Sequence, residues 1–536
     1  MVEHLRMPLL FALVALVLRA PALLHVELNW DEALYWQIGG ELLKGHAPYT
    51  GTWDRKPPGL FAVLAAIQAV AGDGIVALRL GTAAMVVASA LALRAIAQHL
   101  LPGLPHACTA AGLIYIAGSM RGVGDGTNAE LLLAPFALWG IALALSAGVS
   151  RHARTALAAG VLGGCALLIK QVAVVEVAVA ALVLATLPAL AGRGLALGGT
   201  ARLLAVLGAG VALPVALVAA WYAAIDRLPL LVGVLGAAAD AGDAPLNLEG
   251  LMAGLRSYGI VIAATLAGLA ALLVGGVGRA VGAGAAGLAA WIAGVAAMLL
   301  LLGRFADHMM IQALPPLALG TAALAVLVVR ALHRSVPWAA RHPRLAPAAA
   351  ALLLLAWGVG TPFLAAAETL WHRQAADVAQ GATHWGDRTA TIAAALRPRI
   401  EGPGDLFVAS RMLGLYRETG TTPPTRFPFV LHLWAPYAPI DGLAELQRIL
   451  GSRPAFVVVD NLWLPGGPRQ GDAQIRVLDR LAEALARDYV PDGRTGRFTT
   501  WRGGFIGGGI GATVFRRADV PPFTPGQAVL RYDPVP

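Results

Sequence analysis

Apolar runs of about 20 residues recur through the first two-thirds of the chain and constrain its fold more than any other feature. A run of this length matches the hydrocarbon thickness of a bilayer. Of the 536 residues, 58% are hydrophobic and only 13% are charged, which is more apolar surface than a soluble domain can bury. We therefore predict a polytopic α-helical membrane protein with about eleven spans, at 7–26, 75–93, 107–120, 131–147, 156–169, 172–191, 203–224, 258–277, 283–302, 309–329 and 345–366.

The formal net charge of +9 is consistent with Arg-rich loops on the cytoplasmic side of a membrane, so we do not expect nucleic-acid binding. Such loops occur at 94–106, 151–154, 193–202 and 330–344. These basic loops all lie on the same side of the membrane only if the short apolar segment 59–72 does not cross the bilayer. This segment is therefore predicted to be a helix lying in the outer interface, with the N-terminus of the chain inside and its C-terminal part outside.

The composition changes after residue 366, where charges, prolines and tryptophans return. Buried strands are predicted at 405–410 and 455–460, and helices at 374–396 and 473–489, which indicates a small α/β domain. We predict a transmembrane domain over 1–366, whose first outer loop spans 27–73. An extracytoplasmic α/β domain would follow over 367–536.

The first outer loop carries the strongest candidate site residues. Asp31 and Glu32 follow the first span, where a carboxylate could act as a general base or hold a divalent cation; an acidic start to a helix is the alternative. Asp54, Arg55 and Lys56 precede two prolines. Cations at headgroup depth could bind a lipid phosphate, or could simply anchor the loop at the interface.

Further polar residues are predicted on the same outer side, each with a structural alternative such as a polar turn, a helix start or interfacial anchoring. They are Asp125, Asn128, Glu130, Lys170, Arg304 and His308. Together these residues supply carboxylates for a base and cations for an anionic leaving group. No zinc-type spacing, Ser-His-Asp arrangement or Gly-rich phosphate loop stands out, and the two cysteines, Cys108 and Cys165, lie in apolar runs.

The order of these motifs resembles the membrane-embedded C-type glycosyltransferases that use a polyprenyl-phosphate sugar. It is most similar to bacterial relatives of the dolichyl-phosphate-mannose protein mannosyltransferases (glycosyltransferase family 39) and of the lipid A aminoarabinose transferases. The resemblance rests on Asp31-Glu32, on Asp54 to Pro58 in place of Asp-Lys-Pro-Pro, on Arg79, on Asn128 and Glu130, and on His308 to Pro316. Arg55 is an insertion in the second motif, and Met309 replaces a tyrosine in the last.

The resemblance implies an inverting sugar transfer with Asp31 as the base on the acceptor, or as the residue that orients it. Glu32 and Glu130 would assist, and a divalent cation is one option for them. Lys56, Arg304 and His308 would hold the donor phosphate, while Asp54, Arg55, Asp125, Asn128 and Lys170 are further substrate-binding candidates. The implied location is the bacterial inner membrane, with the C-terminal domain in the periplasm.

The sequence leaves the sugar, the acceptor and metal use open. The acceptor could be a glycan, a lipid such as lipid A, or a protein. A lipid or sugar transporter or flippase is an alternative that would place charged residues near the middle of the bilayer. A non-catalytic membrane scaffold is the second alternative.

Overall fold

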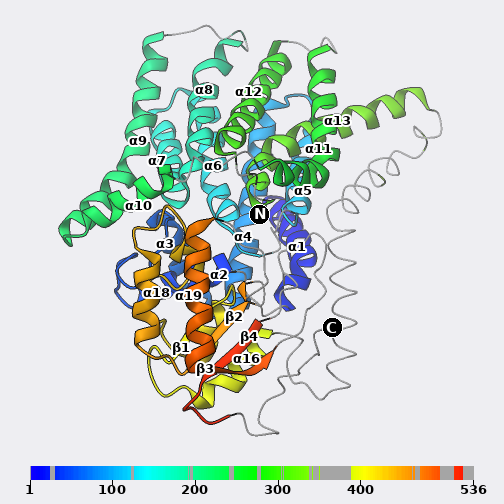
Figure 1. Ribbon diagram of the computed structural model, residues 1–536. Helices are drawn as coiled ribbons and strands as arrows, with labels where there is room; N and C mark the ends of the chain where they lie inside the picture. Colours follow the sequence, from blue (N-terminus) through cyan, green and yellow to red (C-terminus); the bar gives the residue numbers. More distant parts are fainter. Residues whose placement is uncertain are drawn as a thin grey trace.

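The structure is a computed structural model. It describes residues 2–24, 30–121, 126–190, 192, 197–240, 247–274, 279–303, 305, 307–336, 341, 349, 388–460, 463–464, 471–494 and 512–522. Within this part the chain forms a bundle of long helices, with a small mixed α/β domain at one end (Figure 1).

Ten of the eleven predicted spans coincide with described helices, and the last, 345–366, lies outside the described residues. These helices are α1 (Val2–Leu24), α4 (Ile75–Leu100), α5 (Pro105–Gly118), α6 (Ala129–Ser150), α7 (Ala153–Ile169), α8 (Val174–Leu190), α9 (Leu197–Ala224), α11 (Leu248–Val274), α12 (Arg279–Leu302) and α13 (Leu314–Ser335). By length and composition, seven described helices can cross a membrane. The protein is thus a multi-pass membrane protein, and the total of eleven crossings stays a prediction.

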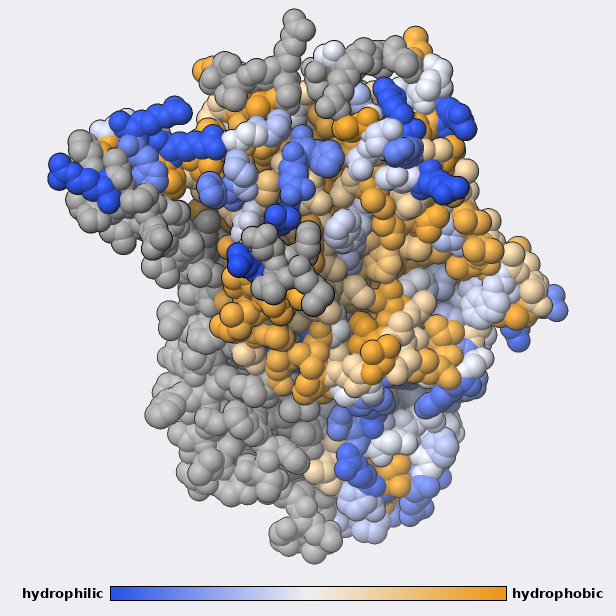
Figure 2. Space-filling model, turned by 180° about the vertical axis from the view of Figure 1, so that it is seen from behind, coloured by the Kyte–Doolittle hydropathy of each residue, from blue (hydrophilic) through white to orange (hydrophobic). Residues whose placement is uncertain are grey.

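The helical bundle buries apolar side chains in its core and also exposes many apolar side chains on its outer side. Figure 2 shows hydrophobic residues spread over the side of the bundle and hydrophilic ones gathered at its ends and on the C-terminal domain. On α9, for example, Leu217 is 62% exposed and Trp221 is 42% exposed. Such a band is unstable in water and matches the hydrocarbon of a bilayer.

Two short helices of the first outer loop, α2 (Trp30–Leu43) and α3 (Pro58–Ala71), lie between the bundle and the C-terminal domain (Figure 1). Pro58 occupies the first turn of α3, where a missing N–H has no cost. Each helix has 14 residues, as does α5, and is therefore about 21 Å long. Helix α3 matches the helix predicted over 59–72, and its position in the outer interface stays a prediction.

The C-terminal domain is built on a four-stranded sheet with the order β1-β2-β4-β3. The strands are β1 (Leu406–Ala409), β2 (Phe456–Asp460), β3 (Tyr489–Arg494) and β4 (Ala512–Arg517). The first two pair in parallel, Leu406 opposite Phe456, and β4 runs antiparallel to both of its neighbours. The predicted strands are confirmed as β1 and β2.

Helices accompany this sheet: α16 (Arg388–Leu396), α17 (Gly414–Thr419), α18 (Gly442–Gly451), α19 (Asp472–Asp488) and the 3-10 turn η5 (Val430–Leu433). Helix α19 confirms the helix predicted over 473–489, whereas most of the one predicted over 374–396 lies outside the described residues. Between the predicted spans 203–224 and 258–277 lies a further helix, α10 (Leu228–Asp240).

Glycines bring α7 and α9 unusually close together. A Cβ atom added to Gly160 would lie 2.1 Å from the carbonyl oxygen of Leu207, and one added to Gly164 would lie 2.4 Å from that of Val211. Small residues permit such backbone contact, which supplies much of the packing energy between helices in a membrane.

We expect Gly160→Val to destabilise the protein by about 1–3 kcal/mol, because the new side chain must push the two backbones apart. The same change at Gly208 of α9 is a matched control, since a Cβ there would have no neighbour within 4 Å. Thermal unfolding in detergent measures the difference. Equal melting temperatures for the two variants would contradict the close contact.

Candidate active site

The candidate site lies where the first outer loop meets the ends of α4, α6, α7 and α13 and the C-terminal domain. Helix α2 brings Asp31 and Glu32 in its first turn, where acidic side chains interact favourably with the helix dipole. Glu32 is only 2% exposed, whereas Asp31 is partly exposed. The adjacent carboxylates therefore occupy different environments.

Glu32 is held by groups from distant parts of the chain. Its Oε1 accepts a hydrogen bond from the Thr127 backbone N–H at 2.5 Å, and its Oε2 lies 3.5 Å from Arg79 Nη2. The Arg79 side chain also donates to the carbonyl oxygen of Ala22 in α1. Glu32 and Arg79 thus join α1, α2, α4 and the segment before α6.

We expect Arg79→Met to destabilise the protein by about 3–5 kcal/mol, because it leaves the buried Glu32 carboxylate without its cation. The double variant Arg79→Met with Glu32→Gln should recover a large part of this loss, since no buried charge then remains. Thermal unfolding in detergent tests both. A single variant as stable as the wild type would show that the pair does not hold the loop.

Asp54 is a second buried carboxylate, 4% exposed, in the same loop. Its Oδ1 accepts the Arg55 backbone N–H at 2.5 Å, while Oδ2 has no hydrogen-bond partner among the described residues. Burial raises the pKa of Asp54 to about 6; Lys56 opposes this effect and Asp31 adds to it. Asp54 therefore lies within electrostatic range of both residues and has an oxygen available to a further donor.

Lys56 lies beside these carboxylates, and its own carbonyl oxygen accepts a hydrogen bond from Tyr49 Oη at 2.6 Å. Burial lowers the pKa of Lys56 to about 8, assisted by Arg55 and Lys170 and opposed by Asp54 and Asp31. The ammonium is hence charged at neutral pH and lies within electrostatic range of two other cations as well as two carboxylates. An ammonium group that burial and neighbouring cations destabilise is stabilised by a bound anion.

Glu130, Lys170 and His308 form a second cluster. Lys170 Nζ donates to Glu130 Oε1, and His308 Nε2 lies 3.8 Å from the same oxygen. Glu130 is in the first turn of α6, Lys170 is the C-cap of α7, and His308 lies on the 3-10 helix η3 (Asp307–Ala313). Three segments far apart in sequence thus converge on one carboxylate.

The two clusters belong to one site. Lys56 acts electrostatically on both Glu130 and His308, and Asp31 acts on His308. The structure therefore brings together seven of the predicted residues: Asp31, Glu32, Asp54, Lys56, Glu130, Lys170 and His308. Chemically, the arrangement joins a partly exposed carboxylate to a group of cationic and hydrogen-donating side chains, which suits proton abstraction next to an anionic group.

The other predicted residues have different positions. Asn128 is the N-cap of α6, where its side chain accepts the Leu131 backbone N–H at 3.1 Å. Arg55 turns to the C-terminal domain, where its guanidinium lies 4.3 Å from the centre of the Tyr437 ring. Asp125 and Arg304 lie outside the described residues. Arg79 is one of the residues that carry the family resemblance, but it is not among the predicted site residues. A charged side chain inside a predicted span is itself a signal of a functional site.

A divalent cation is not favoured by this arrangement. Among the described residues, no group of three or more His, Cys, Asp or Glu side chains is placed to hold a metal ion. Glu32 and Glu130 direct their carboxylates at Arg79 and Lys170, and a metal ion would have to displace these cations.

Comparisons with family models and with curated proteins find no match. Among solved structures, the chain is similar to ArnT from Cupriavidus metallidurans bound to undecaprenyl phosphate: the identity is 15% and the TM-score 0.54, over 97% of this chain and 98% of that one. It also matches the arabinosyltransferase EmbB from Mycobacterium smegmatis at 17% identity and a TM-score of 0.39, over 59% of this chain and 30% of that one. At the level of the fold, the likeness to ArnT confirms the resemblance inferred from the sequence.

Proposed function

We propose that the protein is a membrane glycosyltransferase that moves a sugar from a polyprenyl-phosphate donor to a glycan, lipid or protein acceptor, with inversion at the sugar carbon. The observation that carries this proposal is the position of Asp31 within electrostatic range of the Lys56 ammonium and the His308 imidazole, both of which also interact with Lys170. The fold supports it, because the chain is similar over 97% of its length to ArnT, whose structure is bound to undecaprenyl phosphate.

At the donor end, Lys56 and His308 hold the phosphate, together with Arg304. Glu130 orients Lys170 and His308 through its Oε1. When the bond between the sugar and the phosphate breaks, negative charge grows on the phosphate oxygen. Cations already in place stabilise this charge without rearranging.

At the acceptor end, Asp31 takes the proton from the attacking hydroxyl or amine, or orients that group. It suits this role because it is partly exposed, whereas Glu32 is buried against Arg79 and Thr127. Glu32 thus assists by fixing the first turn of α2. Asp54 lies beside Lys56, and its negative charge favours the charged form of that ammonium.

The proposed setting is the bacterial inner membrane, with the N-terminus in the cytoplasm. The domain over 367–536 lies outside and covers the site, whereas residues 1–366 form the transmembrane domain. This orientation rests on the basic loops of the sequence. The polyprenyl chain remains in the bilayer, whose hydrocarbon stabilises it by about 0.8 kcal/mol per CH2 group.

One observation favours a transporter as the second candidate. Glu176 on α8 is a carboxyl within a span, 4% exposed, and accepts a hydrogen bond from Gln312 at 2.8 Å. Ionisable groups within membrane spans often mark a transport path. The amide partner of Glu176 and the gathering of the other candidate site residues at one end of the bundle favour the transferase instead.

Purified protein in liposomes distinguishes the candidates. We expect a labelled polyprenyl-phosphate sugar to lose its sugar to an acceptor in a native membrane extract, without movement of the lipid between leaflets. Lipid movement without sugar loss would support the transporter. Neither activity, combined with capture of a partner by the full chain, would support a scaffold.

The affinity for the donor should fall as the pH rises through about 8, because Lys56 loses its proton there. The phosphodiester of the donor keeps one negative charge over this range, so the change comes from the protein. The variant Lys56→Arg should bind with constant affinity from about pH 7 to pH 9, since guanidinium stays charged. Donor binding measured by fluorescence titration provides the comparison; equal pH profiles would exclude Lys56 as the titrating group.

A further inference from the structure

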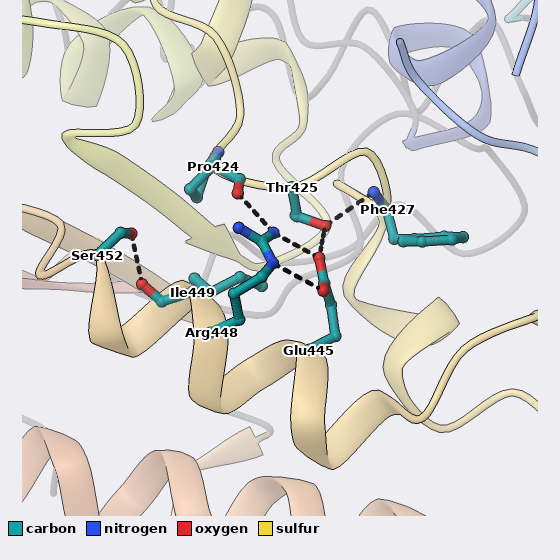
Figure 3. A network of polar contacts seen from close by, with 7 residues as sticks. All are labelled: Pro424, Thr425, Phe427, Glu445, Arg448, Ile449 and Ser452. Atoms are coloured by element: carbon teal, nitrogen blue, oxygen red, sulfur yellow. Dashed lines mark hydrogen bonds and ion pairs between the residues drawn. The ribbon is translucent and has the colours of Figure 1, made fainter. Parts of the chain in front are cut away.

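In the C-terminal domain, a polar network joins α18 to the segment 424–427 (Figure 3), and this segment contacts the first outer loop. On α18, Arg448 donates to Glu445 through Nε at 2.9 Å and through Nη2 at 2.6 Å. Arg448 Nη2 also donates to the carbonyl oxygen of Pro424 at 2.8 Å, and Thr425 Oγ1 donates to Glu445 Oε1 at 2.5 Å. We call Thr425, Glu445 and Arg448 the brace.

The brace fixes the chain from Pro424 to Phe427. Thr425 Oγ1 accepts the backbone N–H of Phe427 at 3.0 Å, and Thr425 is buried. The hydrogen bond from Arg448 lowers the pKa of Glu445, so the carboxylate is charged at neutral pH. A charged acceptor strengthens each of these hydrogen bonds.

The braced segment holds Trp53 of the first outer loop. The carbonyl oxygen of Arg426 accepts the Trp53 backbone N–H at 2.7 Å. The Phe427 ring lies 5.4 Å from the Trp53 ring, and His432 packs edge-on against Trp53 at 4.8 Å. Trp53 is only 3% exposed, so the C-terminal domain, and not solvent, determines where it lies.

Trp53 immediately precedes Asp54, Arg55 and Lys56. After these residues come Pro57 and Pro58, whose rings restrict the backbone, and then α3. Tyr49, which precedes Trp53 in the same loop, donates a hydrogen bond from its Oη to the carbonyl oxygen of Lys56. With Trp53 fixed at one end and α3 at the other, the short stretch between them has little freedom to move.

We propose that Thr425, Glu445 and Arg448 are positioning residues that set the place of Asp54 and Lys56 in the candidate site. The C-terminal domain then does more than cover the site, because it sets where these two side chains lie. This inference rests on the proposed function, because Lys56 is assigned there to the donor phosphate.

The test compares three variants with the wild type. Thr425→Val keeps the side-chain shape but removes the hydroxyl, Thr425→Ser keeps the hydroxyl, and Glu483→Gln is the matched control. Glu483 forms a similar i,i+3 pair with Arg480 on α19, at 3.1 Å and exposed to solvent. The readouts are hydrogen exchange of the peptide around Trp53, followed by mass spectrometry, and affinity for undecaprenyl phosphate.

We expect Thr425→Val to speed the exchange of this peptide and to weaken undecaprenyl phosphate binding, each by roughly tenfold, because both hydrogen bonds of the Thr425 hydroxyl are lost. Thr425→Ser and Glu483→Gln should behave as the wild type. Phe427→Leu removes the ring that packs against Trp53 and leaves the brace intact. It should also speed the exchange and weaken lipid binding, and it replaces Thr425→Val as the test variant if Thr425→Val does not fold.

Unchanged exchange around Trp53 in folded Thr425→Val and Phe427→Leu would overturn the inference and leave the proposed function standing. Faster exchange with unchanged lipid affinity would overturn it as well. Failure of the wild type to bind undecaprenyl phosphate, with exchange still responding to Thr425→Val, would instead overturn the proposed function and support the link between the brace and the loop.

Discussion

Asp31→Asn is expected to lower the rate of sugar transfer by about 10²–10⁴-fold, the range that a positioned general base contributes. Its affinity for polyprenyl phosphate should be unchanged or higher. Asp31 lies within electrostatic range of Lys56, so removing its negative charge makes the phosphate site more positive. A loss of rate combined with retained binding is the signature of a group that acts on the acceptor.

The matched control for this variant is Asp73→Asn. Asp73 follows α3 and forms an exposed ion pair with Arg417 at 3.6 Å, away from the cluster. Single-turnover transfer and lipid binding should both remain as in the wild type. If Asp31→Asn instead loses binding and rate together, the side chain would belong to the donor site, and the assignment of the base would be wrong.

Lys56→Met is expected to weaken donor binding by about 10–100-fold, which corresponds to losing one charge-assisted hydrogen bond to phosphate. Methionine preserves most of the aliphatic volume, so the packing around the loop should persist. The rate should also fall, because the departing phosphate loses a cation. This variant and Asp31→Asn thus differ in one quantity, the affinity for the lipid.

Lys44→Met is the control for this second prediction. Lys44 directly follows α2 in the same loop but is exposed, so its charge is largely screened. Titration with undecaprenyl phosphate at a fixed salt concentration should show wild-type affinity for Lys44→Met. Equal losses in both variants would indicate a general effect of net charge and not a phosphate site at Lys56.

The sequence predicted the membrane part well, because bilayer thickness imposes a strong length signal. The described helices α1 to α13 include ten of the predicted spans, and α3 begins at the expected prolines. The buried strands β1 and β2 were also predicted, since short runs such as Phe-Val-Val-Val are typical of strands covered on both faces.

The other two strands, β3 and β4, could not be predicted from the sequence pattern. Strand β3 contains Pro491 and Gly493, between which the pairing register with β4 shifts. Proline and glycine together indicate a turn in a sequence, so a bulged edge strand there can be recognised only once its partner is known. Helix α10, with 13 residues, is too short to be separated from a loop by length alone.

The partners of the site residues could not be predicted either, because they depend on contacts over long sequence distances. Glu32 and Arg79 are 47 positions apart, and Lys170 and Glu130 are 40 positions apart. The adjacent Asp31 and Glu32 look equivalent in the sequence. Only the fold shows that one carboxylate is buried against an arginine and the other is partly exposed.

The most direct test of the central claim is the fate of a panel of polyprenyl-phosphate sugars in membranes that contain the protein. Mass spectrometry follows the release of free polyprenyl phosphate, with native lipid and protein extract added as the acceptor source. The proposed function predicts that the wild type consumes one donor and that Asp31→Asn spares it. If every donor survives with the wild type present and acceptors supplied, the protein is not a polyprenyl-phosphate-dependent transferase.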